Sequence, residues 1–250
     1  MSTTQNIIAH LIELRKRLLY SVVSILLVFL CLFPWAADLY AMLAQPLLAK
    51  LPEGGQMIAT DVTTPFFVPM KVALMTAFLV ALPFILYQIW SFVAPGLYAH
   101  EKRWIVPLVI SSLVLFICGM AFAYFAVFPM VFGFITASAP KGVAVMTDID
   151  KYLSFVMSMF LAFGVTFQVP VAVVAMVKMG FISVTKLREI RRYVIVGAFI
   201  AGAILTPPDV VSQFMLAMPL WLLYEAGIWV AVWMTKTPLP DNVEVKNTDA

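Results

Sequence analysis

Long apolar runs separated by short polar segments divide this chain into six parts. The runs cover residues 18–37, 68–93, 105–132, 153–177 and 193–205, and a last run that begins at 210 and fades between 224 and 234. Hydrophobicity is nearly continuous within each run, whereas the strands of a membrane barrel alternate over about 10 residues. Because about 20 apolar residues span the hydrocarbon core of a bilayer, the pattern predicts an all-α integral membrane protein with six transmembrane helices.

The last two runs differ from the others in length. At 1.5 Å per residue a helix over 193–205 reaches only about 20 Å, well below the thickness of a bilayer. Pro207 and Pro208 follow it and predict a tight turn before the next run. The sequence therefore predicts short fifth and sixth spans.

Composition supports a membrane location and charge gives the orientation. The 250 residues are 63% hydrophobic and 12% charged, against about 25% charged in a soluble domain. The segments on one side, 1–17, 94–104, 178–192 and 236–250, together carry 12 Lys and Arg. The segments on the other side, 38–71, 133–152 and 206–209, carry 4 over the same total length. The positive-inside rule then places both termini in the cytoplasm.

We expect one six-helix transmembrane domain over 1–235 and a flexible cytoplasmic tail over 236–250. Its net charge of +3 is spread over loops, so nucleic-acid binding is not expected.

Catalytic and metal-binding motifs are absent from the sequence. His100 and Glu101 resemble the start of a zinc-protease helix, but Trp104 stands where the second histidine would be. There is no nucleophile elbow and no phosphate-binding glycine loop. We therefore expect no enzyme activity, no metal and no cofactor, and an intramembrane hydrolase near His10 or His100 is the least favoured alternative.

Two carboxylates stand out beside the basic segments. Glu13 precedes the first apolar run and Glu101 lies between the second and third, so two crossings separate them and both face one compartment. Each has a simpler explanation, because Glu13 is spaced i, i+4 from Arg17 and Glu101 can cap a helix or balance local charge. Together they predict a cation site, since carboxylates bind a guanidinium bidentately at a partly dehydrated interface.

Several motifs resemble one known family over nearly the whole chain. They are HLIELR (10–15), DVTTPF (61–66), YQIWSFVAPGL (87–97), HEKR (100–103), SFV (154–156), GAF (197–199) and LTPPD (205–209). In combination they are similar to TatC, the multi-spanning subunit of the twin-arginine protein translocase of the bacterial inner membrane. The resemblance implies a multi-pass receptor for the twin-arginine signal peptides of folded proteins, which are exported at the expense of the proton-motive force.

Site residues and partners are also implied by this resemblance. Glu13 and Glu101 correspond to the carboxylates that receive the arginine pair, and their basic neighbours in the site are Arg17, His100 and Arg103. The family assembles with the single-span proteins TatA and TatB in an oligomeric receptor complex. Their docking beside the fifth and sixth spans is assigned to a set of small and polar residues, namely Gly197, Ala201, Thr206 and Gln213. The alternative for the small residues, which is the more common use of such faces, is packing within the bundle.

Two polar residues within the spans remain open to more than one interpretation. Gln168 stands where the family tends to have Glu, and it either forms a hydrogen bond between helices or presents a polar spot to lipid or a partner. Glu225 either extends to the inner interface or pairs with a partner. The alternative function is a secondary transporter of a small cation, with Glu101, Gln168 and Glu225 along its pathway.

Overall fold

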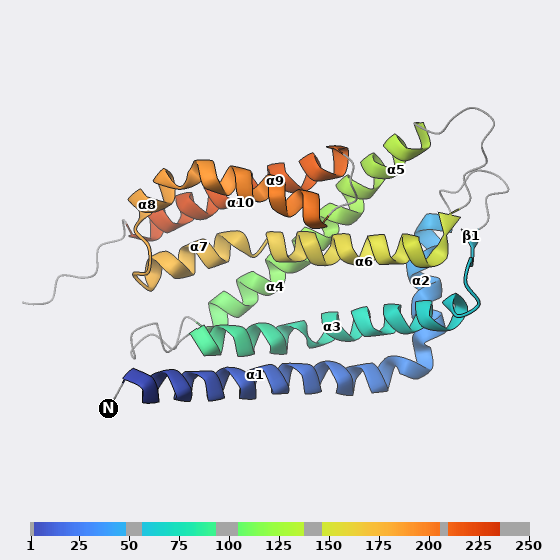
Figure 1. The fold of residues 1–250 in the computed structure, drawn as a ribbon, viewed down its shortest axis with the longest axis horizontal. Coiled ribbons are helices and arrows are strands. Elements are labelled where there is room, and N and C mark those ends of the chain that lie inside the picture. Colours follow the sequence, from blue (N-terminus) through green and yellow to red (C-terminus); the bar gives the residue numbers. More distant parts are fainter. Residues whose placement is uncertain (1–2, 49–56, 94–104, 138–146, 206–209, 236–250) are drawn as a thin grey trace, which may run out of the picture.

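The computed structural model describes residues 3–48, 57–93, 105–137, 147–205 and 210–235, and these are helical almost throughout (Figure 1). In chain order the helices are α1 (Thr3–Leu32), the 3-10 turn η1 (Phe33–Trp35), α2 (Ala36–Leu48), α3 (Thr64–Val93), α4 (Ile105–Phe122), the π-helical turn η4 (Ala123–Val127), α5 (Phe128–Ala137), α6 (Ile149–Thr166), α7 (Val169–Lys178), α8 (Val184–Glu189), α9 (Arg191–Leu205) and α10 (Val210–Thr235). Two short strands, β1 (Met57–Ile58) and β2 (Thr147–Asp148), pair in parallel.

The predicted spans correspond to helices of the structure. Within the described residues, five segments are long and apolar enough to cross a membrane: Ile8–Leu43, Thr64–Val93, Val106–Val131, Ile149–Lys178 and Gln213–Met234. Helix α9 has 15 residues, about 22 Å at the helical rise, and is the short fifth span that the sequence predicts. The predicted all-helical membrane fold is thus confirmed.

The prediction of a short sixth span is wrong. Helix α10 has 26 residues and continues without a break past Tyr224 and Glu225, where the apolar pattern fades. Both polar side chains have partners, because Glu225 forms an ion pair with Arg191 and the Tyr224 hydroxyl donates to the carbonyl of Leu187 at 2.8 Å. A polar group whose partner lies in the same bundle does not end a membrane helix.

The fourth span is two helices where the sequence predicted one. Helix α6 ends at Thr166 and α7 begins at Val169, with Pro170 in the first turn of α7. Proline has no backbone N–H, so the last turn of α6 cannot continue its hydrogen bonds into α7. The interruption places Gln168 at the junction of the two helices.

Figure 1 shows the bundle as helices that lie roughly along one direction, with α4 crossing them diagonally. Helix α1 packs mainly on α3, α4 packs on α3 and α6, and α10 packs on α7 and α9. The interior is apolar around Met159 and Phe163 of α6, which are fully buried. Close approach of α4 and α6 depends on glycine, since a Cβ on Gly119 would lie 2.5 Å from the carbonyl oxygen of Phe163.

One end of the bundle carries α2 and the two short strands, opposite the end where α1 begins (Figure 1). Helix α2 is continuous over Ala36–Leu48. Asp148 caps the N-terminus of α6 by accepting from the backbone N–H of Asp150 at 2.8 Å, and the Thr60 hydroxyl also donates to its carboxylate. The Thr60 hydrogen bond, helped by the backbone N–H groups and opposed by partial desolvation, lowers the pKa of Asp148. Lys71 of α3 pairs with Asp150 at 2.6 Å, so this end is held by polar contacts.

Candidate functional site

Glu13, the first of the two predicted carboxylates, is held by a guanidinium from its own helix. The Nε and Nη2 of Arg17 donate to Glu13 Oε1 at 3.0 and 2.6 Å. This is the i, i+4 pair that the sequence predicts. The side chain of Glu13 remains 37% exposed, and from the described residues its Oε2 receives no hydrogen bond.

Gln88 connects this pair to α3. Arg17 Nη1 donates to Gln88 Oε1 at 3.3 Å, and Gln88 is buried in α3. Next to it, the rings of His10 and Phe92 stack with centroids 4.3 Å apart and planes inclined by 19°. Glu13 is therefore fixed against the last turns of α3. Sequence reasoning did not select Gln88, although an amide near the end of an apolar run, within the YQIWSFVAPGL motif, was an available signal.

Several predicted site residues lie outside the described part of the chain. Glu101, His100 and Arg103 belong to segment 94–104, which joins the end of α3 to the start of α4, and Thr206 belongs to segment 206–209. The predicted meeting of Glu13 with Glu101 is thus not tested by the described residues.

Gln168 forms the hydrogen bond between helices that was one of its two interpretations. Its Nε2 donates to the carbonyl of Ser112 in α4 at 2.9 Å, while the hydroxyl of Ser112 accepts from Trp90 Nε1 of α3 at 2.9 Å. Ser112 is fully buried, and Gln168 Oε1 is buried without a partner among the described residues. This polar chain joins α3, α4 and the α6–α7 junction inside the bundle.

Glu225 is engaged within the chain. Its carboxylate pairs with the Arg191 guanidinium at the start of α9, and the two side chains are 26% and 40% exposed. An intramolecular pair was not among the interpretations considered for Glu225. Gln168 bonds to α4 and Glu225 to α9, so both side chains that a small-cation pathway would use form contacts within the chain.

The small residues of α9 divide between two faces. Ala198 and Gly202 are buried, and a Cβ on Gly202 would lie 3.1 Å from the carbonyl oxygen of Gln213 in α10. Gln213 in turn donates from Nε2 to the carbonyl of Phe199 at 3.1 Å. Gly197 is exposed with open space around its Cα, and Ala201 is half-buried one turn later. The Ala198 face is therefore used inside the bundle, whereas Gly197 faces outward.

A class of protein follows from these observations. Among the described residues there is no cluster of three His, Cys, Asp or Glu side chains that could hold a metal. Long apolar helices enclose a packed interior, and basic residues gather at the start of α1 and over α8 and the start of α9, as in a multi-pass membrane protein. The family model described as Sec-independent protein translocase protein (TatC) matches residues 9–219. The chain therefore belongs to the TatC family.

Similar proteins with this description come from several bacteria. The chain is 54% identical over 226 residues to the Sec-independent protein translocase protein TatC of Escherichia coli strain K12, covering 90% of this chain and 88% of the relative. It is 50% identical over 246 residues to the Haemophilus influenzae protein of the same name, covering 98% and 95%. A crystal structure of the twin arginine translocase receptor TatC superposes with a TM-score of 0.80 at 39% identity, covering 91% of this chain and 100% of that one.

Family membership gives the chain its general role. It is a multi-pass component of Sec-independent protein translocation in the bacterial cytoplasmic membrane, a transport component and not an enzyme. Family membership alone does not identify the residues that contact cargo and partner subunits.

Proposed function

We propose that this chain is the receptor subunit that binds the paired arginines of a signal peptide with the carboxylates of Glu13 and Glu101. Binding takes place at the cytoplasmic end of the bundle and precedes export driven by the proton-motive force. The observation that carries the proposal is the contact at Glu13, whose carboxylate already accepts two N–H groups of a guanidinium. The contact shows that the Glu13 carboxylate is placed to accept guanidinium N–H groups, and because Arg17 already neutralises it, the charge that balances the incoming arginines comes from Glu101.

Arg17 acts in this proposal as a positioning residue. Its bonds to Glu13 use Oε1 and its remaining Nη1 donates to Gln88, so the carboxylate is held in one orientation with Oε2 available. An incoming guanidinium binds at Oε2 without displacing Arg17. The Glu13 side chain is 37% exposed, which leaves it partly open to a ligand at the interface.

Glu101 is within reach of the same ligand by chain length. Phe92 stacks on His10, one turn of α1 from Glu13. The nine residue steps from Phe92 to Glu101 reach at most about 30 Å, which permits the two carboxylates to share one dication. His100 and Arg103 flank Glu101 in the sequence and complete the proposed site.

The test is crosslinking of this chain in membranes to a twin-arginine signal peptide that carries a photoreactive residue beside the arginine pair. Glu13→Gln and Glu101→Gln remove a charge but keep an acceptor, and each is expected to weaken peptide binding by about tenfold or more. Glu189→Gln is the matched control, because Glu189 is an exposed carboxylate on α8 at the same basic end. A twin-lysine peptide should bind more weakly, since lysine lacks the bidentate fork. Normal binding and export in both carboxylate variants would refute the site.

We further propose that TatA- and TatB-type single-span helices dock on the outward face of α9, at Gly197 and Ala201, with Thr206 and Gln213 as polar contacts at its end. Gly197 is exposed and Ala201 is half-buried one turn later, and small residues at this spacing allow a neighbouring membrane helix to approach closely. Gly197→Leu should reduce crosslinking to a partner helix, and Gly133→Leu is the control, because a Cβ added at either glycine would meet nothing within 4 Å. Equal loss in both variants would argue against docking at α9.

A further inference from the structure

The guanidinium of Arg17 contacts only one oxygen of the Glu13 carboxylate. Its Nε and Nη2 both donate to Oε1, at 3.0 and 2.6 Å. The frequent geometry for these two side chains is a pair of parallel hydrogen bonds, one to each carboxylate oxygen. Within the described residues Oε2 of Glu13 accepts no hydrogen bond. The pair therefore leaves unused the oxygen on which the proposed binding of a signal-peptide arginine depends.

Gln88 of α3 provides the reason for this one-sided contact. Arg17 Nη1 donates to Gln88 Oε1 at 3.3 Å, so the guanidinium has acceptors on both α1 and α3. Gln88 is only 9% exposed, and the stacking of His10 on Phe92 holds α1 beside the same end of α3. The amide oxygen is therefore a fixed acceptor on the neighbouring helix, and it orients the guanidinium relative to Glu13.

We propose that Gln88 is a positioning residue of the signal-peptide site, which keeps Arg17 from occupying both oxygens of Glu13. Without this acceptor the guanidinium can turn and form the bidentate pair within α1, because the i, i+4 spacing places the two side chains together. Oε2 is then taken, and an incoming arginine has to displace Arg17. The inference rests on the proposed function and adds to it the residue that keeps the site open.

The first test is the affinity of the full chain for a fluorescent twin-arginine signal peptide, measured by anisotropy in detergent micelles. Gln88→Met keeps the length of the side chain but removes the acceptor, and it should weaken binding about fivefold. Gln88→Glu restores an acceptor for Nη1 and should bind at least as tightly as the unaltered chain. Gln168→Met is the matched control, because it removes another interior amide, bonded to the Ser112 carbonyl, and should leave the affinity unchanged.

A double variant separates positioning from a merely structural role. If Arg17 blocks Glu13 once the Gln88 acceptor is gone, adding Arg17→Met to Gln88→Met frees both carboxylate oxygens and should recover most of the lost affinity. If Gln88 only holds α1 against α3, the double variant should bind as weakly as Gln88→Met or more weakly. That second result would overturn the proposal.

Infrared spectroscopy of the chain without peptide tests the same step independently of peptide binding. The separation between the antisymmetric and symmetric stretches of a carboxylate differs between binding through one oxygen and binding through both. The bands of Glu13 are obtained as the difference between each protein and its Glu13→Gln variant. Their separation should change in Gln88→Met but not in Gln168→Met, and an unchanged separation in Gln88→Met would overturn the proposal.

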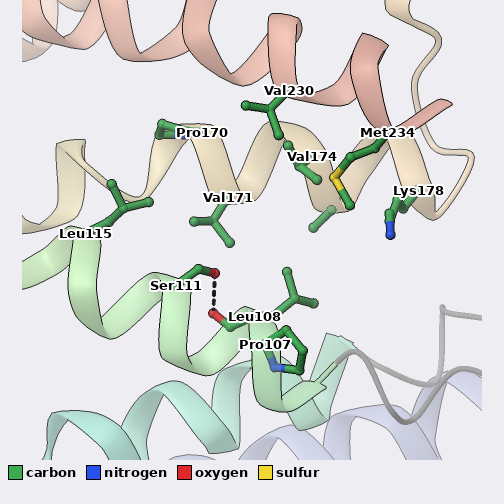
Figure 2. A pocket seen from close by; sticks show the side chains of 11 residues that line it. Pro107, Leu108, Ser111, Leu115, Pro170, Val171, Val174, Lys178, Val230 and Met234 are labelled. Atoms are coloured by element: carbon green, nitrogen blue, oxygen red, sulfur yellow. Dashed lines mark hydrogen bonds between the residues drawn. The ribbon is translucent and has the colours of Figure 1, made fainter. Parts of the chain in front are cut away.

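The outcomes also distinguish this inference from the proposed peptide site. The apolar cavity between α4, α7 and α10 has no Asp or Glu among the described residues that line it, so it offers an arginine no competing carboxylate (Figure 2). Unchanged peptide affinity in Glu13→Gln would refute the peptide site, and this inference with it. Weaker binding in Glu13→Gln together with unchanged affinity in Gln88→Met would overturn this inference alone.

Discussion

Gln168 shows how one amide is accommodated inside the membrane-spanning part. Its Nε2 has a partner in the Ser112 carbonyl, but its Oε1 is buried without one among the described residues. Hydrogen bonds between membrane helices contribute about 0.6 kcal/mol on average, and an unpaired buried acceptor costs a similar amount or more. The favourable and unfavourable contributions of this side chain to the free energy of unfolding nearly cancel.

We therefore expect Gln168→Leu to change the free energy of unfolding by less than about 1 kcal/mol. Trp90→Phe is the comparison, because it leaves the fully buried Ser112 hydroxyl without its donor and should cost more. Unfolding in mixed detergent micelles would measure both. A much larger loss for Gln168→Leu than for Trp90→Phe would mean that Gln168 has a contact beyond Ser112.

Asp148 makes the end of the bundle opposite the basic segments sensitive to acid. Hydrogen bonds from Thr60 and from the backbone hold its pKa below the usual value of about 3.9. The stability it contributes is present above that value and is lost as the pH falls through the lowered pKa, because protonation removes the acceptor charge. We expect faster hydrogen exchange at 57–60 and 147–151 as the pH falls below the usual aspartate pKa of about 3.9 and through the lowered pKa of Asp148.

Asp148→Asn provides the control, since asparagine also caps a helix but does not titrate. After correction for the intrinsic pH dependence of exchange, this variant should show no acid-induced opening in the same segments. Equal acid sensitivity in both proteins would assign the effect to another carboxylate.

Contacts between residues close in sequence were more predictable than contacts between residues far apart in sequence. The Glu13–Arg17 pair follows from helical spacing alone and was predicted. The Arg17–Gln88 bond joins positions 71 residues apart, and the pairing of Glu225 with Arg191 depends on how α9 and α10 pack. No periodicity in the sequence encodes such pairs, because they depend on how the helices pack against one another.

At the scale of elements, glycine determines how closely α4 and α6 approach. A Cβ on Gly164 would lie 2.5 Å from the Phe116 ring, and one on Gly119 would meet the backbone of α6. Gly164→Ala should lower the free energy of unfolding by about 1–3 kcal/mol, the usual cost of overpacking. Gly197→Ala should be neutral or stabilising by up to about 1 kcal/mol, because alanine favours helix and nothing lies within 4 Å.

Unfolding of the two alanine variants in parallel measures this difference directly. If both substitutions cost the same, backbone propensity and not the contact with Phe116 would be the cause. The comparison also tests the packing in which Gly197 faces away from the bundle.

Helix existence was predictable from hydrophobic runs, but helix ends and interruptions were not. The runs identify each span because the requirement for about 20 apolar residues is imposed by the bilayer. The break at Gln168, the single helix α2 and the continuation of α10 past Glu225 all depend on partners elsewhere in the fold. Strands β1 and β2 are short and pair across about 90 positions of the chain, which leaves no local pattern to detect.

At the scale of the whole molecule, the spans have unequal lengths. The other candidate spans have 22 to 36 residues, whereas α9 has 15 and begins with Arg191 and Arg192 at the basic end. Two arginines hold that end at the headgroup level. Ile204 then lies about 20 Å deeper along the helix, roughly 10 Å short of the far interface of a flat bilayer.

A bilayer responds to a short helix by thinning beside it or by admitting water. A nitroxide attached at Ile204, which is 76% exposed, should therefore report contact with a water-soluble relaxation agent. The same label at Val165, midway along the Ile149–Lys178 span, is the control and should report contact with oxygen in the hydrocarbon core. If Ile204 proves as inaccessible to water as Val165, the membrane beside α9 is not thinned, and contact with another membrane helix must cover the end of the short helix.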